Sequence, residues 1–282
     1  MAENGAFNYE GKVWGAPQVR LAPTYMQALK LRYYLEDLKP ISGRVLDIGC
    51  GAGNMPKAIK HYRPDLEVWG ADLSRHAIEA ALRDPEGVQF VTSGGEGLPF
   101  PDGFFDAVSM FDVLEHFAEP EQALAEVRRV LRPHGLFHLF LPLEKQPWTI
   151  YALLYRLGWQ AKVEHCGHLQ FYSDADCRRQ LEKVGFQVRG RRWSVHPLYA
   201  LVDAAYFTAL SLRGKPVSTS VEGYIHSHNG HPTMAQRAVR LLKDGLVGMG
   251  DFESRALGWL PGGGGHFSAI TEDSMPKETN DE

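Results

Sequence analysis

Apolar residues recur along this chain at two spacings, and stretches of the two kinds alternate. Short apolar runs predict strands at 44–48, 66–72, 88–92, 104–111 and 136–142. Apolar residues three and four positions apart predict helices at 21–38, 55–62, 75–82, 121–131, 149–158 and 174–184, with a further strand at 186–193. Strands that alternate with helices of ordinary length imply right-handed crossovers and a mostly parallel sheet.

The alternation ends after Trp193. An apolar stretch at 196–212 and a basic amphipathic pattern at 234–249, with a loop rich in Gly, Ser and His between them, predict two helices before a last strand. We therefore predict an α/β fold: a doubly wound, Rossmann-like sheet of seven strands with helices on both faces. The predicted divisions are a helical N-terminal cap (1–40), a core (41–193), a helical insertion (194–264), a final core strand (265–272) and a disordered tail (273–282).

Composition narrows the class of protein. A hydrophobic fraction of 44% suits a packed core, and a net charge of −4 gives no sign of a nucleic-acid or anionic-membrane partner. The three cysteines form no metal-binding pattern, which favours a reducing, cytoplasmic setting. Neither a signal peptide nor an uncharged run of transmembrane length is expected.

A glycine-rich turn follows the first predicted strand. Asp47 leads into Gly49, Gly51 and Gly53, at the carboxyl end of the strand, where such sheets bind ligands. A dinucleotide fingerprint would need a glycine at position 54, where Asn54 stands, and this weakens a nicotinamide interpretation. The alternative is a tight turn without a ligand.

An acidic residue, Asp72, ends the second predicted strand. A carboxylate there can accept two hydrogen bonds from a ribose diol. It can instead cap the next helix, although Ser74 already offers such a cap.

Several segments together resemble the class I S-adenosylmethionine-dependent methyltransferases, and in particular their type 11 small-molecule branch. They are "VLDIGCGAGN", "GADLS", "SGGEGLPFPDGFFDAVSMFDVLEH", "VRRVLRPHGLFHLFLP" and "FYSDADCRRQLEKVGF", in the family's order, between residues 43 and 193. The resemblance implies S-adenosylmethionine as cofactor. In that case Asp47 and the glycine backbone hold its methionine end, Asp72 holds the ribose, Leu73 lies beside the adenine, and Phe111 and Asp112 lie near the transferred methyl. The implied cofactor-binding residues are Asp47, Gly49, Cys50, Gly51, Asp72, Leu73, Gly95, Glu96 and Phe111.

Many relatives carry an aspartate where this chain has Gly94. An adenine contact must therefore come from the backbone or from Glu96, or be missing.

The implied reaction is methyl transfer to a small acceptor, with S-adenosylhomocysteine as the product. We expect O- or C-methylation of an apolar acceptor: a quinone, a natural product or a lipid. Candidate catalytic bases are His116 and His168, with His165 beside the latter. Either could equally be a structural or surface histidine. The insertion is a candidate substrate pocket, homodimer surface or peripheral membrane contact, or only a pair of packed helices.

Two other functions stay open: a nicotinamide-dependent oxidoreductase and a catalytically silent, cofactor-binding partner protein. Nucleic-acid methylation is not expected, because the Asn/Asp-Pro-Pro-Tyr/Phe tetrad is missing and the fourth strand reads "MFDVLEH".

The segment "DVLEH" raises the question of a metal. It is similar to an acid-x-x-Glu-His pattern of some ubiquinone-pathway O-methyltransferases that is linked to a divalent ion. Asp112, Glu115 and His116 would offer oxygen, oxygen and nitrogen ligands. Since many metal-free relatives end this strand in the same way, no metal is assigned from the sequence.

Overall fold

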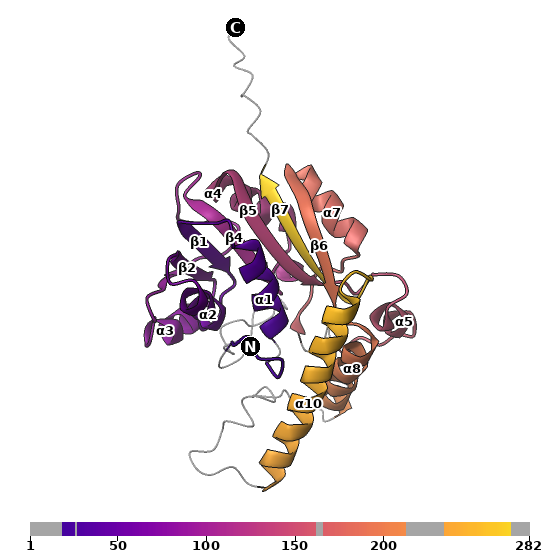
Figure 1. Cartoon of the computed structure of the whole chain (residues 1–282). Helices are drawn as coiled ribbons and strands as arrows, with labels where there is room; N and C mark the ends of the chain where they lie inside the picture. Colours follow the sequence, from indigo (N-terminus) through magenta and orange to yellow (C-terminus); the bar gives the residue numbers. More distant parts are fainter. Residues whose placement is uncertain (1–18, 26, 162–165, 213–233, 272–282) are drawn as a thin grey trace, which may run out of the picture.

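The computed structural model describes residues 19–25, 27–161, 166–212 and 234–271 (Figure 1). Residues 1–18 and 26 of the predicted N-terminal cap, His165, the loop 213–233 and the predicted disordered tail 273–282 lie outside these ranges.

A single seven-stranded sheet organises the chain, as predicted. Its strands are β1 (Arg44–Ile48), β2 (Glu67–Asp72), β3 (Gln89–Thr92), β4 (Phe105–Phe111), β5 (Leu131–Pro142), β6 (Phe186–Ser194) and β7 (Gly264–Thr271). They lie in the order β3-β2-β1-β4-β5-β7-β6, and only β7 runs antiparallel to its neighbours. The strand order reverses between β1 and β4, so the carboxyl ends of these two strands mark the place where such a sheet binds ligands.

Helices cover both faces of the sheet. The helices before the insertion are α1 (Ala28–Asp37), α2 (Asn54–Tyr62), α3 (Arg75–Leu82), the 3-10 turn η1 (Leu114–His116), α4 (Pro120–Val130), α5 (Ile150–Arg156) and α7 (Asp174–Lys183). Apolar side chains of α1 and α2 share one core cluster, and those of α4 and α7 share the other. The apolar periodicity that predicted these helices therefore reports burial against the sheet.

The first helix is shorter than predicted. The sequence pattern predicted it from residue 21, but residues 21–25 form turns and α1 begins at Ala28. The backbone of Leu21 is satisfied by side chains: its N–H donates to the Tyr62 hydroxyl (3.3 Å) and its carbonyl accepts from Arg32 (3.4 Å). The bond from Arg32 replaces the one that the Leu21 carbonyl would have accepted within a helix, whereas an N–H in a first helical turn has no intrahelical partner.

Between β6 and β7, within the predicted insertion, the described residues form two further helices. They are α8 (Pro197–Leu212) and α10 (Met234–Leu257), which ends eight residues beyond the predicted 249. Figure 1 shows α10 as a long rod beside β6 with α8 next to it, and the two helices contact each other. Within the described residues, no helix is both long and apolar enough to cross a membrane.

Candidate active site

The glycine-rich turn joins β1 to α2 and needs left-handed backbone at three positions. Gly49, Gly51 and Gly53 have φ angles of 73°, 54° and 78°. A Cβ at Gly49 would lie 2.3 Å from a Val113 methyl group, and a Cβ at Gly53 would lie 2.5 Å from the Phe90 ring. Both the turn and its close packing therefore require glycine.

Asp72, at the end of β2, organises this turn. One of its carboxylate oxygens accepts from the Gly51 N–H (2.7 Å) and the other from the Ser74 N–H (2.8 Å). The helix cap comes from Ser74, whose hydroxyl oxygen accepts from the Ala77 N–H (3.1 Å). Asp72 is thus a partly exposed carboxylate held at the carboxyl end of β2, beside the glycine turn.

Asp47, at the end of β1, is the buried carboxylate of the site. It is 3% exposed and accepts a hydrogen bond from the Ser109 hydroxyl (2.8 Å). Burial raises its pKa to about 7; the Ser109 bond opposes this rise and the Asp72 charge adds to it. Cys50 lies close by, and burial keeps the pKa of its thiol well above the usual value, so it packs as a neutral group.

The residues predicted to lie beside the adenine include an exposed apolar side chain, Leu73. Leu73 is 64% exposed and lies next to Gly94, while a Cβ on Gly95 would lie 2.6 Å from the Phe117 ring. Glu96 is exposed. An exposed leucine beside a glycine backbone suits a flat aromatic ligand.

At the end of β4 the sheet meets α1. Phe111 pairs with Phe140 of β5, and Asp112 has a φ of 55° and an ion pair with Lys30 of α1. The Lys30 ammonium also lies 4.1 Å from the centre of the Phe140 ring. The pairing of residues 82 positions apart gave no signal in the sequence, so Lys30 was not predicted.

The two predicted bases meet at this edge of the sheet. His116 and His168 have ring centres 5.1 Å apart, and both approach the carboxylate of Glu115. His168 is 7% exposed and bonds through Nδ1 to Glu144 (2.7 Å), whereas His116 is half-buried. Burial and the neighbouring His168 lower the pKa of His116, which favours its neutral form.

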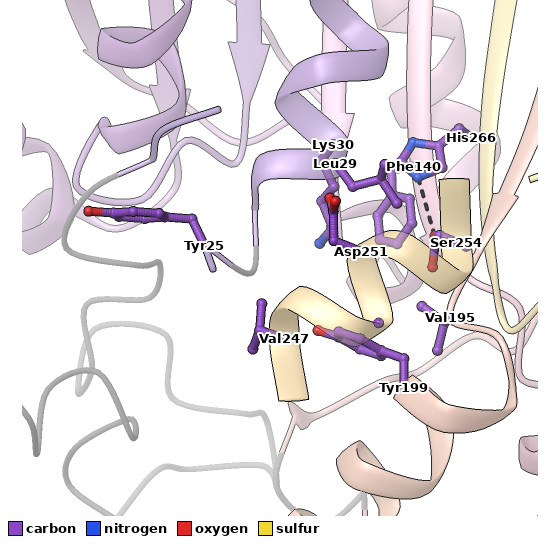
Figure 2. Close-up of a pocket in the computed structure, with 12 residues that line it drawn as sticks. Tyr25, Leu29, Lys30, Phe140, Val195, Tyr199, Val247, Asp251, Ser254 and His266 are labelled. Carbon is purple, nitrogen blue, oxygen red and sulfur yellow. Dashed lines mark hydrogen bonds between the residues drawn. The ribbon is translucent and has the colours of Figure 1, made fainter. Parts of the chain in front are cut away.

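A pocket opens next to this edge, between α1 and the insertion (Figure 2). Its apolar wall includes Leu29, Phe140, Val195 and Val247, and its polar wall includes Lys30, Asp251 and His266. The volume enclosed is about 40 Å³. Asp251 pairs with Arg255 (2.9 Å).

His266 lies in that polar wall, and its Nε2 is 3.3 Å from the Ser194 hydroxyl. Burial, His138 and Lys30 hold its pKa well below the usual value, so its imidazole stays neutral. The sequence did not indicate His266 or Asp251, because the pocket gathers residues from both ends of the chain.

Comparison with known proteins identifies the class. A family model described as a methyltransferase domain matches residues 20–190, more than half of the chain. The chain therefore belongs to this methyltransferase family, as its motifs predicted.

Individual relatives agree with this assignment. The demethylmenaquinone methyltransferase of Thermus thermophilus is 35% identical over 130 residues, which are 45% of this chain and 59% of that protein. The chain thus matches little more than half the length of that relative.

Solved structures share the fold. The superposition on the [4+2]-cyclase SpnF covers 87% of this chain and 81% of the SpnF chain, with a TM-score of 0.55 and 20% sequence identity. A second solved structure is the phosphoethanolamine N-methyltransferase 2 of Haemonchus contortus in complex with S-adenosyl-L-methionine. The superposition covers 86% of this chain and 52% of that chain, with a TM-score of 0.53 and 15% sequence identity.

Methyltransferases of this fold generally use S-adenosylmethionine, and the site here suits that molecule. Asp72 offers carboxylate oxygens beside the glycine turn, and the exposed Leu73 offers an apolar surface. The assignment of cofactor contacts to individual residues stays a prediction for the whole set: Asp47, Gly49, Cys50, Gly51, Asp72, Leu73, Gly95, Glu96 and Phe111.

Proposed function

We propose that the protein transfers a methyl group from S-adenosylmethionine to a small, largely apolar acceptor, by O- or C-methylation of a quinone-type ring. The pocket of Figure 2 is the observation that carries this proposal. It adjoins the end of β4 through Lys30, which pairs with Asp112, and through Phe140, which pairs with Phe111. The name of the Thermus thermophilus relative supports a quinone-type acceptor.

The chemistry of the donor explains the composition of this site. A sulfonium is already a strong methyl donor, so orientation of the acceptor supplies much of the rate. The pocket offers an apolar wall for a ring and a neutral imidazole, His266, for a hydrogen bond to a ring oxygen. A cavity of about 150 Å³ is known to hold benzene. The present volume of about 40 Å³ is smaller, so α10 must shift when the acceptor binds.

Ligand-induced thermal shift tests the cofactor. We expect S-adenosylhomocysteine and S-adenosylmethionine, each at about 100 times its dissociation constant, to stabilise the protein by about 2.7 kcal/mol. NAD is expected to have no effect, because Asn54 replaces the third fingerprint glycine. Stabilisation by NAD alone would contradict the methyltransferase proposal and favour the oxidoreductase alternative. Binding without methyl transfer to any quinone-type acceptor would instead favour the silent-partner alternative.

Filling the pocket should separate acceptor binding from cofactor binding. Val247 is buried on α10 and lines the pocket, so Val247→Phe is expected to lower kcat/KM for the acceptor at least about tenfold, through overpacking of about 1–3 kcal/mol. Leu242→Phe, on an exposed position of the same helix, is the matched control. Methyl-transfer kinetics and S-adenosylhomocysteine affinity are measured for both variants. An unchanged KM and kcat in Val247→Phe would exclude this pocket as the acceptor site.

A cytoplasmic location is part of the proposal, supported by Cys50 and Cys177, two buried cysteines that form no disulfide. The expected dimer or membrane contact of the insertion also stays a prediction. Exposed apolar side chains on α10, among them Leu241, Met249 and Phe252, suit either partner.

A further inference from the structure

Three side chains with metal-ligating atoms converge at the carboxyl ends of β4 and β5. Glu115 and His116 belong to the turn η1, and His168 comes from the segment that precedes α7. One ligand atom from each lies within 4.8 Å of the other two, and His168 Nε2 is 4.0 Å from Glu115 Oε1.

The carboxylate of Glu115 accepts no hydrogen bond from the described residues. The residue is 0% exposed, and neither carboxylate oxygen has a hydrogen-bond donor among the described residues. Its backbone is nonetheless fixed, since the Glu115 carbonyl accepts from the N–H groups of Leu169 and Gln170 (2.9 Å each). An ionised carboxylate in such a place is costly unless a cation compensates it.

Both histidines are oriented by bonds through Nδ1. The Glu144 carboxylate lies 2.7 Å from His168 Nδ1, and the Gly167 carbonyl lies 3.2 Å from His116 Nδ1. A carbonyl or carboxylate at this distance holds the proton on Nδ1 and so places the lone pair on Nε2. Carboxylates and backbone carbonyls orient metal-bound imidazoles in this way.

We propose that Glu115, His116 and His168 bind a zinc ion, with Glu144 as the positioning residue for His168. Two imidazoles and one carboxylate suit zinc, whereas magnesium and calcium prefer oxygen ligands throughout. Zinc bonds of about 2.1 Å set tetrahedral ligand atoms about 3.4 Å apart. The distances between the ligand atoms, now within 4.8 Å, therefore shorten by at most about 1.4 Å when the ion binds. Three protein ligands would leave a tetrahedral zinc ion one position for water or an acceptor oxygen.

This ligand set differs from the one that the sequence offered. Asp112 is occupied by Lys30, and His168 takes its place from a segment 52 residues further along the chain than His116. As ligands, His116 and His168 hold the ion and do not serve as catalytic bases. Zinc binding is measured without methyl donor or acceptor, so this inference stands or falls independently of the proposed function.

The experiment uses untagged protein stripped with EDTA and then titrated with ZnCl₂, CoCl₂ or MgCl₂ by calorimetry. We expect one zinc per chain and a cobalt complex with visible absorption bands, and no heat with magnesium. Glu115→Gln and His168→Gln should each weaken zinc binding at least about 100-fold, and Glu144→Gln about 10- to 100-fold. Asp112→Asn and the surface variant His61→Gln should bind as the unchanged protein does.

Three outcomes would overturn the inference. They are the absence of zinc binding in the unchanged protein, undiminished binding in Glu115→Gln and His168→Gln, and a loss in Asp112→Asn as large as that in His168→Gln. Circular dichroism melts of each variant confirm that the chain is folded. The isosteric Glu115→Gln keeps the inference falsifiable if a histidine variant unfolds.

Discussion

Replacing Asp72 with alanine is expected to weaken S-adenosylhomocysteine binding at least about 100-fold. The Asp72 carboxylate holds the Gly51 N–H of the glycine turn and the Ser74 N–H at the start of α3. Hydrogen bonds to a charged group contribute about 1.5–3 kcal/mol each. In the proposed complex the same oxygens also accept from the ribose diol, so the variant loses both the shape of the turn and a direct contact.

Calorimetric titration with S-adenosylhomocysteine measures this loss. Asp65→Ala is the control, because Asp65 is an exposed aspartate that pairs only locally with Arg63. Asp72→Asn separates the two roles of the carboxylate. In this variant the amide oxygen of residue 72 can still accept one of the two backbone hydrogen bonds. The NH₂ group meets the other backbone N–H, which is also a donor, so we expect an intermediate affinity. Equal affinities for the unchanged protein and Asp72→Ala would remove Asp72 from the cofactor site.

Local sequence patterns predicted the elements well where the chain's own periodicity decides the structure. The strand predicted at 44–48 and the helix predicted at 75–82 match β1 and α3 residue for residue. The glycine turn between β1 and α2 was predictable for the same reason, since a D-x-G-x-G-x-G spacing is a local signal. Where side-chain partners from far away decide a boundary, as for Leu21 with Tyr62, the prediction was wrong.

The surroundings of the site depend on contacts that no local pattern encodes. Lys30 meets Asp112, and Glu144 meets His168, only after the sheet has brought their segments together. The pocket likewise joins α1 to α10 and β7. Local sequence patterns therefore predicted the glycine turn and the two strand ends beside it, and left most of the pocket lining unpredicted.

Replacing Asp47 with asparagine is expected to stabilise the free protein at alkaline pH and weaken cofactor binding. An aspartate in an unfolded chain ionises near pH 4, whereas burial raises the pKa of Asp47 in the folded protein to about 7. The folded state therefore binds this proton more tightly, and stability falls as the pH rises from about 4 to about 7. An asparagine side chain does not ionise, so the variant does not lose this stability as the pH rises.

The stability gained by Asp47→Asn should thus grow by about 2.6 kcal/mol between pH 5 and pH 8. Denaturant unfolding at the two pH values measures it, and Asp102→Asn, at an 83% exposed side chain, should show no such trend. A cofactor whose methionine end carries an ammonium group gains from the Asp47 charge. We therefore expect S-adenosylhomocysteine affinity at pH 8 to fall at least about tenfold in Asp47→Asn. A variant more stable yet weaker in binding would show that the buried charge is retained for the cofactor at the expense of stability. A variant that loses stability at pH 8 would instead show that the Asp47–Ser109 hydrogen bond outweighs the burial of the charge.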